Sequence, residues 1–191
     1  MTSSGTATGA RQPLMVAVVG LLLVSACSTA AQNPYQSPSG FGQVVAVAER
    51  MPAPEVTGTL LDGSEFTLQD WAGKVVVINF WGSWCGPCRV EAPELRAVHE
   101  ATRARGVEFL GVDVKDQRDL ATAFEDRFGI AYPSIFDPRG EVSLQFQNFP
   151  ANAIPTTIVI DRAGRVASLF PRPLREVDLL PVVLRLAEET A

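Results

Sequence analysis

The stretch that most constrains the fold runs from residue 75 to residue 93 and reads VVVINFWGSWCGPCRVEAP. Its first part, residues 75–80, is apolar and rich in β-branched side chains, which predicts a buried strand. Cys85 and Cys88 follow, at the start of a segment whose spacing favours a helix. Thiols at these positions of a helix start can form a disulfide with little backbone movement. A helix N-terminus also stabilises a thiolate, so the stretch predicts a dithiol that exchanges with disulfides.

The composition limits the classes of protein to which the chain can belong. With 191 residues, 47% of them apolar, the chain is long enough for one core-forming domain. Its formal net charge is −5 and it has no block of Lys or Arg, which argues against nucleic acid as a partner. Three cysteines are too few for a disulfide-stapled scaffold. We expect no cofactor.

The first residues predict a targeting segment. Residues 1–26 contain no acidic residue and one base, Arg11. The apolar run at residues 14–24 is shorter than the about 20 residues that span a bilayer, and it fits the core of a secretory signal peptide. Val-Ser-Ala-Cys at residues 24–27 resembles a bacterial lipobox, which implies cleavage before Cys27 and lipidation of its sulfur. The alternative is an ordinary signal peptide, or an uncleaved anchor, with an incidental cysteine.

Either alternative places the domain on the extracytoplasmic side, where disulfides persist. The lipobox would anchor the protein to the cell membrane through acyl chains, and otherwise the protein would be secreted. Residues 28–42 are uncharged and rich in Ser, Pro, Gly, Asn and Gln, which is typical of a flexible tether. We therefore expect a signal peptide at 1–26, a lipidated N-terminus and tether at 27–45, and one domain at 46–191.

Apolar runs and turn signals predict the remaining elements. Residues 56–60 and 65–68 flank an Asp-Gly turn and predict a hairpin. Residues 107–114 predict a second buried strand, parallel to the first because a helix connects them. Further strands are expected at 134–136, 156–160 and 165–170, and further helices at 116–128, 142–146 and 174–189. The order predicts an α/β fold, a mixed central sheet flanked by helices.

The helix that begins at the cysteine pair should end at Gly106. Its apolar residues Val90, Leu95 and Val98 are expected to face inward, and Pro93 to kink it.

Three motifs in order resemble the thioredoxin superfamily. Residues 84–88, Trp-Cys-Gly-Pro-Cys, match its active-site pentapeptide, and Pro93 falls where that family kinks its helix. Ile154-Pro155-Thr156 matches its cis-proline loop. The hairpin, the segment inserted before residue 156 and the sequence NFWGSWC at 79–85 are most similar to the membrane-tethered TlpA/ResA/DsbE group. The resemblance implies a thioredoxin-like fold over most of residues 56–191.

The cysteine pair divides the chemistry between two sulfurs. Cys85 caps the helix and should be the attacking thiolate, and Cys88 should resolve the mixed disulfide. A zinc site is the alternative for such a pair, but the sequence has no second ligand pair, and His99 is expected on the helix surface. We expect no metal. Gly86 and Pro87 would tune the redox potential.

Residues around the cysteines would contact the client. The resemblance implies that Pro155 faces the pair and that the backbone beside it, at Ile154, binds an extended substrate. The alternative for Pro155 is a proline at the start of an edge strand. Trp84 and Trp81 would shape the contact surface, although Trp81 fits the core equally well.

A proton acceptor for the resolving thiol is also expected. Thioredoxin carries a buried Asp where this chain has Asn79, and an amide cannot take its place. Glu91 lies one helical turn after Cys88, where ResA-like proteins carry a glutamate, and a partly desolvated carboxylate there could exchange protons with the thiol. The alternative is a solvated glutamate balanced by Arg89 or Arg96.

The resemblance implies an enzyme, a thiol-disulfide oxidoreductase acting as a protein disulfide reductase. Its clients would be exported cysteine-containing proteins such as apocytochrome c, and a CcdA-type membrane protein would donate electrons. The Gly-Pro dipeptide favours this direction because thioredoxin has a low potential, about −270 mV, against about −120 mV for DsbA. The alternative is a DsbE-like oxidase that introduces disulfides.

Two other classes fit less well. A SCO-like copper chaperone would need CxxxC and a downstream histidine, and a peroxiredoxin would need Thr where Gly82 stands. We expect a monomer.

Overall fold

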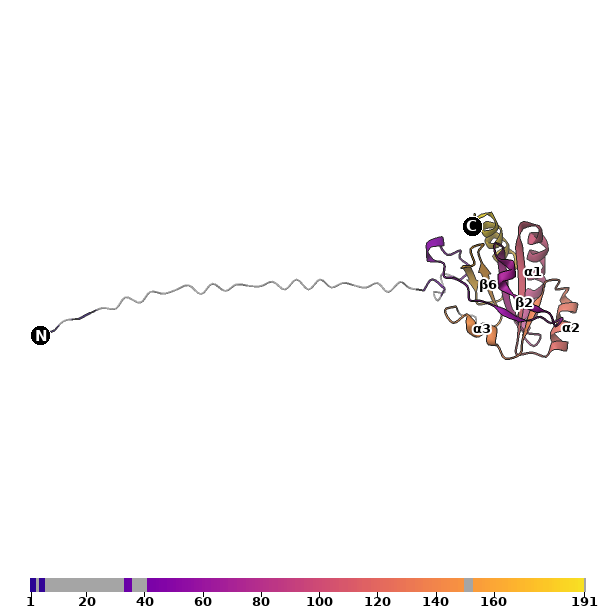
Figure 1. Cartoon of the computed structure of the whole chain (residues 1–191), viewed down its shortest axis with the longest axis horizontal. Coiled ribbons are helices and arrows are strands. Elements are labelled where there is room, and N and C mark those ends of the chain that lie inside the picture. The colour runs from indigo at the N-terminus through magenta and orange to yellow at the C-terminus, as the bar shows by residue number, and fades with distance from the viewer. Residues whose placement is uncertain (3, 6–32, 36–40, 150–152, 191) are drawn as a thin grey trace. The chain divides into compact units, whose positions relative to one another are not determined.

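The computed structural model describes residues 1–2, 4–5, 33–35, 41–149 and 153–190 (Figure 1). Cys27 and nearly all of the predicted signal peptide lie outside the described residues. Within these ranges, no helix is both long and apolar enough to cross a membrane.

A five-stranded mixed sheet carries the fold, with strand order β5-β4-β3-β6-β7. Its central strand, β3 (Val75–Trp81), is buried along its whole length, as an apolar β-branched run predicts. β3 pairs in parallel with β4 on one side and antiparallel with β6 on the other. The other strands are β4 (Val107–Val114), β5 (Ser134–Asp137), β6 (Thr156–Ile160) and β7 (Val166–Phe170). The predicted α/β fold with a mixed sheet is confirmed.

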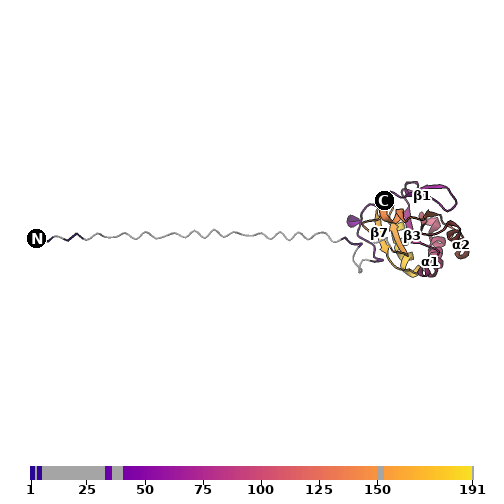
Figure 2. The same ribbon diagram turned by 90° about the horizontal axis from the view of Figure 1, so that it is seen from below.

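Helices cover both faces of this sheet. On one face, α1 (Gly86–Thr102) and α4 (Glu176–Glu188) lie against each other and pack on alternate residues of β3 and β4. On the other face, α3 (Glu141–Gln145) and the segments before β3 cover the remaining side chains. The fourth helix, α2 (Arg118–Phe128), packs by α1 near the cysteine pair, and Figure 2 shows both beside the strands.

The predicted hairpin is present as a separate two-stranded sheet of β1 (Thr57–Thr59) and β2 (Glu65–Thr67). Gly63 takes a positive φ of 90° in its turn, a conformation that glycine adopts without steric cost. Leu60 bridges from it to Ile135 beside the main sheet. Among the described residues, short 3-10 helices are also present at Val47–Glu49, Leu68–Trp71 and Arg103–Arg105.

The face of α1 corrects one expectation. Leu95 and Val98 are buried, but Val90 is 73% exposed, so its predicted inward position was wrong. At about 100° per residue, Val90 lies off the face on which Cys88, Leu95 and Val98 align. The helix ends at Thr102, and Gly106 follows the short 3-10 turn with a positive φ of 72°.

Part of the range predicted as a tether packs on the domain. Tyr35 is 2% exposed, and its hydroxyl donates a hydrogen bond to the Val166 carbonyl over 2.6 Å. The amides of Gly42 and Val45 donate to carbonyls of β7. These contacts extend the folded unit toward the N-terminus.

Candidate active site

The two cysteines form a disulfide at the start of α1. Cys85 is the residue that caps this helix, and its Sγ accepts a hydrogen bond from the Cys88 amide over 3.2 Å. Cys85 is 4% exposed and Cys88 1%, so both are buried in the disulfide form. Gly86 and Pro87 are the first two residues of the helix, where the missing N–H of proline costs no hydrogen bond. After reduction, a thiolate on Cys85 would face the positive end of α1.

In the loop before Cys85, both the amide and the carbonyl of Ser83 form hydrogen bonds with side chains. Its amide donates to Oδ2 of Asp116 over 2.5 Å. Its carbonyl accepts from Nε and Nη2 of Arg89, over 3.0 and 2.7 Å. Neither partner was expected at the site, although Arg89 directly follows the cysteine motif and Asp116 closely follows a predicted strand.

Glu91 lies inside the protein at 1% exposure. Its Oε1 accepts a hydrogen bond from Nδ2 of Asn79 over 2.8 Å, and its Oε2 accepts from the Leu174 amide over 3.2 Å. Burial raises the pKa of Glu91 to about 7, although both hydrogen bonds favour the ionised form. The alternative of a solvated glutamate balanced by Arg89 or Arg96 is therefore wrong.

Asn79, which donates a hydrogen bond to Glu91, also lies near Cys88. Asn79 and Cys88 line the same small void behind the disulfide. Glu91 and Cys88 also share the buried face of α1, one turn apart. A carboxyl group with a pKa near neutrality thus lies one helical turn after the inner cysteine, on the same buried face of α1.

The Ile154–Pro155 peptide bond is cis, as the resemblance implies. Pro155 is buried, and Ile154 packs against the cluster of buried residues that contains both cysteines. The loop also provides one wall of a hollow of about 310 Å³ beside the cysteine motif. Trp84, Val114, Lys115, Gly140 and Ser143 line the rest of the hollow.

The two tryptophans have different positions. Trp84 is 55% exposed at the rim of this hollow. Trp81 is buried and stacks on Phe124 with ring centroids 4.5 Å apart, so it belongs to the core.

His99 is not the surface residue that we expected. It is half-buried and packs edge-on against Phe109 and Tyr132. In the described ranges, no group of three or more His, Cys, Asp or Glu residues could hold a metal ion.

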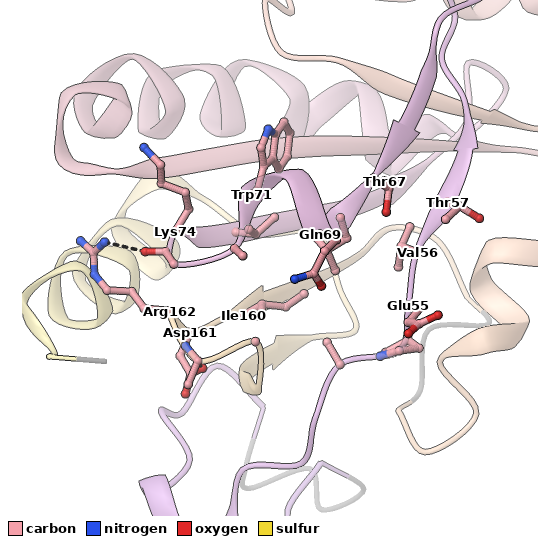
Figure 3. A pocket seen from close by; sticks show the side chains of 18 residues that line it. Glu55, Val56, Thr57, Thr67, Gln69, Trp71, Lys74, Ile160, Asp161 and Arg162 are labelled. Atoms are coloured by element: carbon pink, nitrogen blue, oxygen red, sulfur yellow. Dashed lines mark hydrogen bonds between the residues drawn. The ribbon is translucent and has the colours of Figure 1, made fainter.

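Another hollow, of about 530 Å³, lies at the other end of β3 (Figure 3). Trp71, Lys74 and Ile160 are among its lining residues. At its edge, Arg162 donates from Nη1 to the Gly73 carbonyl over 3.0 Å. Because Cys85 follows the opposite end of β3, this hollow is separate from the cysteine site.

Sequence reasoning missed the contacts that cross the fold. The Leu174 amide reaches Glu91 from 83 residues away, and no local signal marks it. Asp113 and Asp116 could have been singled out from the sequence, because both are acidic residues at the end of a predicted buried strand.

Comparisons with known proteins show the family to which the chain belongs. The model of the AhpC/TSA family matches residues 50–169. The thiol-disulfide oxidoreductase ResA of Geobacillus kaustophilus is 34% identical over 139 residues, 73% of this chain and 78% of that protein. The thiol:disulfide interchange protein HelX of Rhodobacter capsulatus is 33% identical over 145 residues, 75% of this chain and 76% of that protein.

Solved structures are similar over the same region. A secreted thiol-disulfide isomerase of Corynebacterium glutamicum has a TM-score of 0.75 and 38% identity, covering 81% of this chain and 97% of that one. A DsbF homologue of Corynebacterium diphtheriae has a TM-score of 0.73 and 37% identity, covering 80% and 98%.

Proposed function

Because the chain belongs to the AhpC/TSA family of thioredoxin-like proteins and is a thiol-disulfide oxidoreductase of the ResA/HelX/DsbE type, we propose that it reduces disulfides of exported proteins. One observation carries the proposal: the cysteine pair at the start of α1 is followed, one turn on and on the same buried face, by a carboxyl group whose pKa is raised to about 7. A dithiol with a proton acceptor near neutrality is what disulfide reduction requires.

The reaction would proceed in two exchange steps. The Cys85 thiolate attacks one sulfur of the client disulfide, forms a mixed disulfide and releases the other client sulfur as a thiolate, which takes a proton from solvent. The Cys88 thiol then loses its proton and attacks Sγ of Cys85, which releases the second client thiolate. Two electrons pass to the client, and the Cys85–Cys88 disulfide remains.

Glu91 would accept the proton that Cys88 loses. Its neighbour Asn79 cannot titrate, so the carboxyl of Glu91 is the proton-binding group of the pair. A group with a pKa near the working pH can both take up and return a proton. The carboxylate form of Glu91 would be restored when the proton passes to solvent or to the departing thiolate.

The surface beside Cys85 would bind the client. Trp84 is exposed, and the backbone next to Pro155 would pair with an extended segment of the client. We infer that side chains flanking the client cysteine enter the hollow between Trp84 and Ile154.

We propose that the protein acts in the cell envelope, attached to the membrane. Lipidated Cys27 would hold the domain, residues 46–191, at the membrane through the segment at 27–45. A dithiol membrane protein of the CcdA type would then reduce the Cys85–Cys88 disulfide after each turnover. ResA and HelX relatives support apocytochrome c as the client.

A second function is the reverse reaction, disulfide formation in exported proteins. The similarity to a secreted isomerase and to a DsbF homologue favours it. A strongly stabilised Cys85 thiolate would drive the chemistry in that direction.

A single-turnover assay tests the proposal. The reduced protein is mixed with an oxidised peptide that carries the haem-attachment pattern Cys-x-x-Cys-His. We expect the peptide to be reduced and Cys88→Ser to accumulate a mixed disulfide at Cys85, while Cys85→Ser does neither. If the peptide stays oxidised and the reduced peptide is instead oxidised by the disulfide form, the second function holds.

A further inference from the structure

Asp113 is a buried acid that the proposed reaction does not use. It is 0% exposed, and neither of its carboxyl oxygens accepts a hydrogen bond from a residue that the structure describes. It lies on β4 directly opposite Trp81, the last residue of the strand that leads to Cys85. An ionised carboxylate in this position would lose its hydration without compensation, at a cost of several kcal/mol.

The Asp116 carboxyl lies within hydrogen-bond reach of Asp113. Two ionised carboxylates only accept, so a hydrogen bond between these side chains requires a proton on one of them. Asp116 already accepts N–H groups from Ser83 and Gln117, over 2.5 and 2.8 Å. These donors favour its charged form, so the proton belongs on Asp113.

The pKa shifts of Asp113 and Asp116 agree with placing the proton on Asp113. Burial and then the Asp116 charge raise the pKa of Asp113 to about 8. Burial opposes ionisation of Asp116 as well, but its hydrogen bonds hold the pKa below the usual range.

We propose that Asp113 is a positioning residue for Cys85. As a neutral acid, Asp113 donates a hydrogen bond to the Asp116 carboxylate. Asp116 in turn accepts a hydrogen bond from the Ser83 amide and so fixes the loop ahead of Cys85. The proposal deepens the proposed function, in which Cys85 attacks the client. It assigns no contact with the client, and Asp113 acts only through Asp116 and Ser83.

Ionisation of Asp113 would loosen this arrangement because acidic groups surround it. Asp116 follows its own strand, Glu125 comes from α2, and Asp137 comes from β5. The nearest cation in the sequence, Lys115, places its side chain beside Gly140 instead. Once Asp113 loses its proton, two carboxylates repel each other, and Asp116 is displaced from Ser83. Arg89 alone then holds the loop.

NMR of the oxidised protein tests the hydrogen-bonded chain directly, because Cys85 and Cys88 do not titrate as a disulfide. We expect the Ser83 amide proton and the Asp113 carboxyl carbon to titrate together between about pH 6 and about pH 10. In Asp113→Asn, which keeps an N–H donor toward Asp116 but cannot ionise, the Ser83 amide should stay constant over this range. Glu125→Gln, which removes a half-buried acid near Asp113, should keep the Ser83 titration and move it to lower pH.

Alkylation of the reduced protein supplies the functional readout. The rate constant at Cys85 should change severalfold with an inflection that coincides with the Asp113 titration, and Asp113→Asn should lack that inflection. A Ser83 amide that ignores Asp113, or a Cys85 profile that Asp113→Asn leaves unchanged, overturns the proposal. Neither result depends on the client or on the direction of electron flow, so the proposed function would stand or fall separately.

Discussion

Nδ2 of Asn79 donates a hydrogen bond to Oε1 of Glu91 over 2.8 Å, and both side chains are buried. Asn79 also donates to Oγ1 of Thr157 over 3.0 Å, on the neighbouring strand β6. The amide is therefore fixed between sheet and helix, and it holds the Glu91 carboxyl on the buried face of α1 that also carries Cys88. Asn79 and Glu91 together provide one titratable group, which a buried Asp at the position of Asn79 would provide alone.

Glu91→Gln should slow the second exchange step. The substitution keeps the shape of the side chain but removes the group that accepts the Cys88 proton. We expect release of the client from the mixed disulfide to fall about 10²-fold at neutral pH, the lower range for loss of a general base. Stopped-flow measurement of that step over a pH series checks it, with Glu100→Gln on the exposed face of α1 as the control. An unchanged rate and pH profile would remove Glu91 from the mechanism.

Glu91 should also make the folded protein less stable as the pH rises. The pKa of Glu91 in the folded protein is about 7, above its ordinary value of 4.5, so the folded state holds the proton more tightly than the unfolded state. Between these pH values the free energy of unfolding should fall by about 3 kcal/mol from this group alone.

Urea denaturation of the oxidised protein at about pH 5 and about pH 8 measures this effect. Asp113 and Glu125 have raised pKa values too, so the informative quantity is the difference between the wild type and Glu91→Gln. The decline should be smaller in the variant, and equal declines would contradict the assignment.

Arg50→Ala should be strongly destabilising. The guanidinium of Arg50 is 1% exposed and pairs with Asp161 over 3.0 Å and with Glu189 over 2.6 Å. Removal leaves a buried Asp161 carboxylate without one of its cations, at a cost of about 3–5 kcal/mol. Urea denaturation measures the loss, and Arg139→Ala, at an exposed pair with Glu141, should stay within about 0.5 kcal/mol of the wild type.

Trp84→Ala should weaken client binding without changing the fold. Its ring is 55% exposed beside Cys85, so truncation removes contact area but little of the core. We expect KM for a protein client to rise about 10-fold, while the reaction with dithiothreitol stays unchanged. Val90→Ala, at an exposed apolar position on α1, is the matched control. Equal effects on dithiothreitol and on the client would show damage to the thiols rather than to the surface.

Local patterns were enough to predict most of the fold. The apolar run of β3, the turn at Gly63 and the stop at Gly106 each depend on neighbouring residues, and the structure contains all three. Val90 was misplaced because an apolar side chain was assigned inward without regard to its angle around the helix. The reverse held for Glu91, a charged residue that occupies the inner face.

Contacts between distant segments could not be predicted. The resemblance brought Glu91 close to the thiols, but its bond to the Leu174 amide depends on how α4 approaches α1. The hydrogen bond from the Ser83 amide to Asp116 and the ion pairs of Arg50 likewise join elements whose separation no local pattern specifies. Half-burial of His99 follows from the position of Tyr132, which packs on it from a distant loop.

The midpoint potential of the Cys85–Cys88 pair tests the central claim, reduction of exported disulfides, most directly. The protein is equilibrated with dithiothreitol or glutathione redox buffers, and the fraction in the disulfide form is read from Trp fluorescence or from alkylation. The account predicts a value near or below that of thioredoxin, about −270 mV. A value near that of DsbA, about −120 mV, would contradict it and assign the protein to disulfide formation.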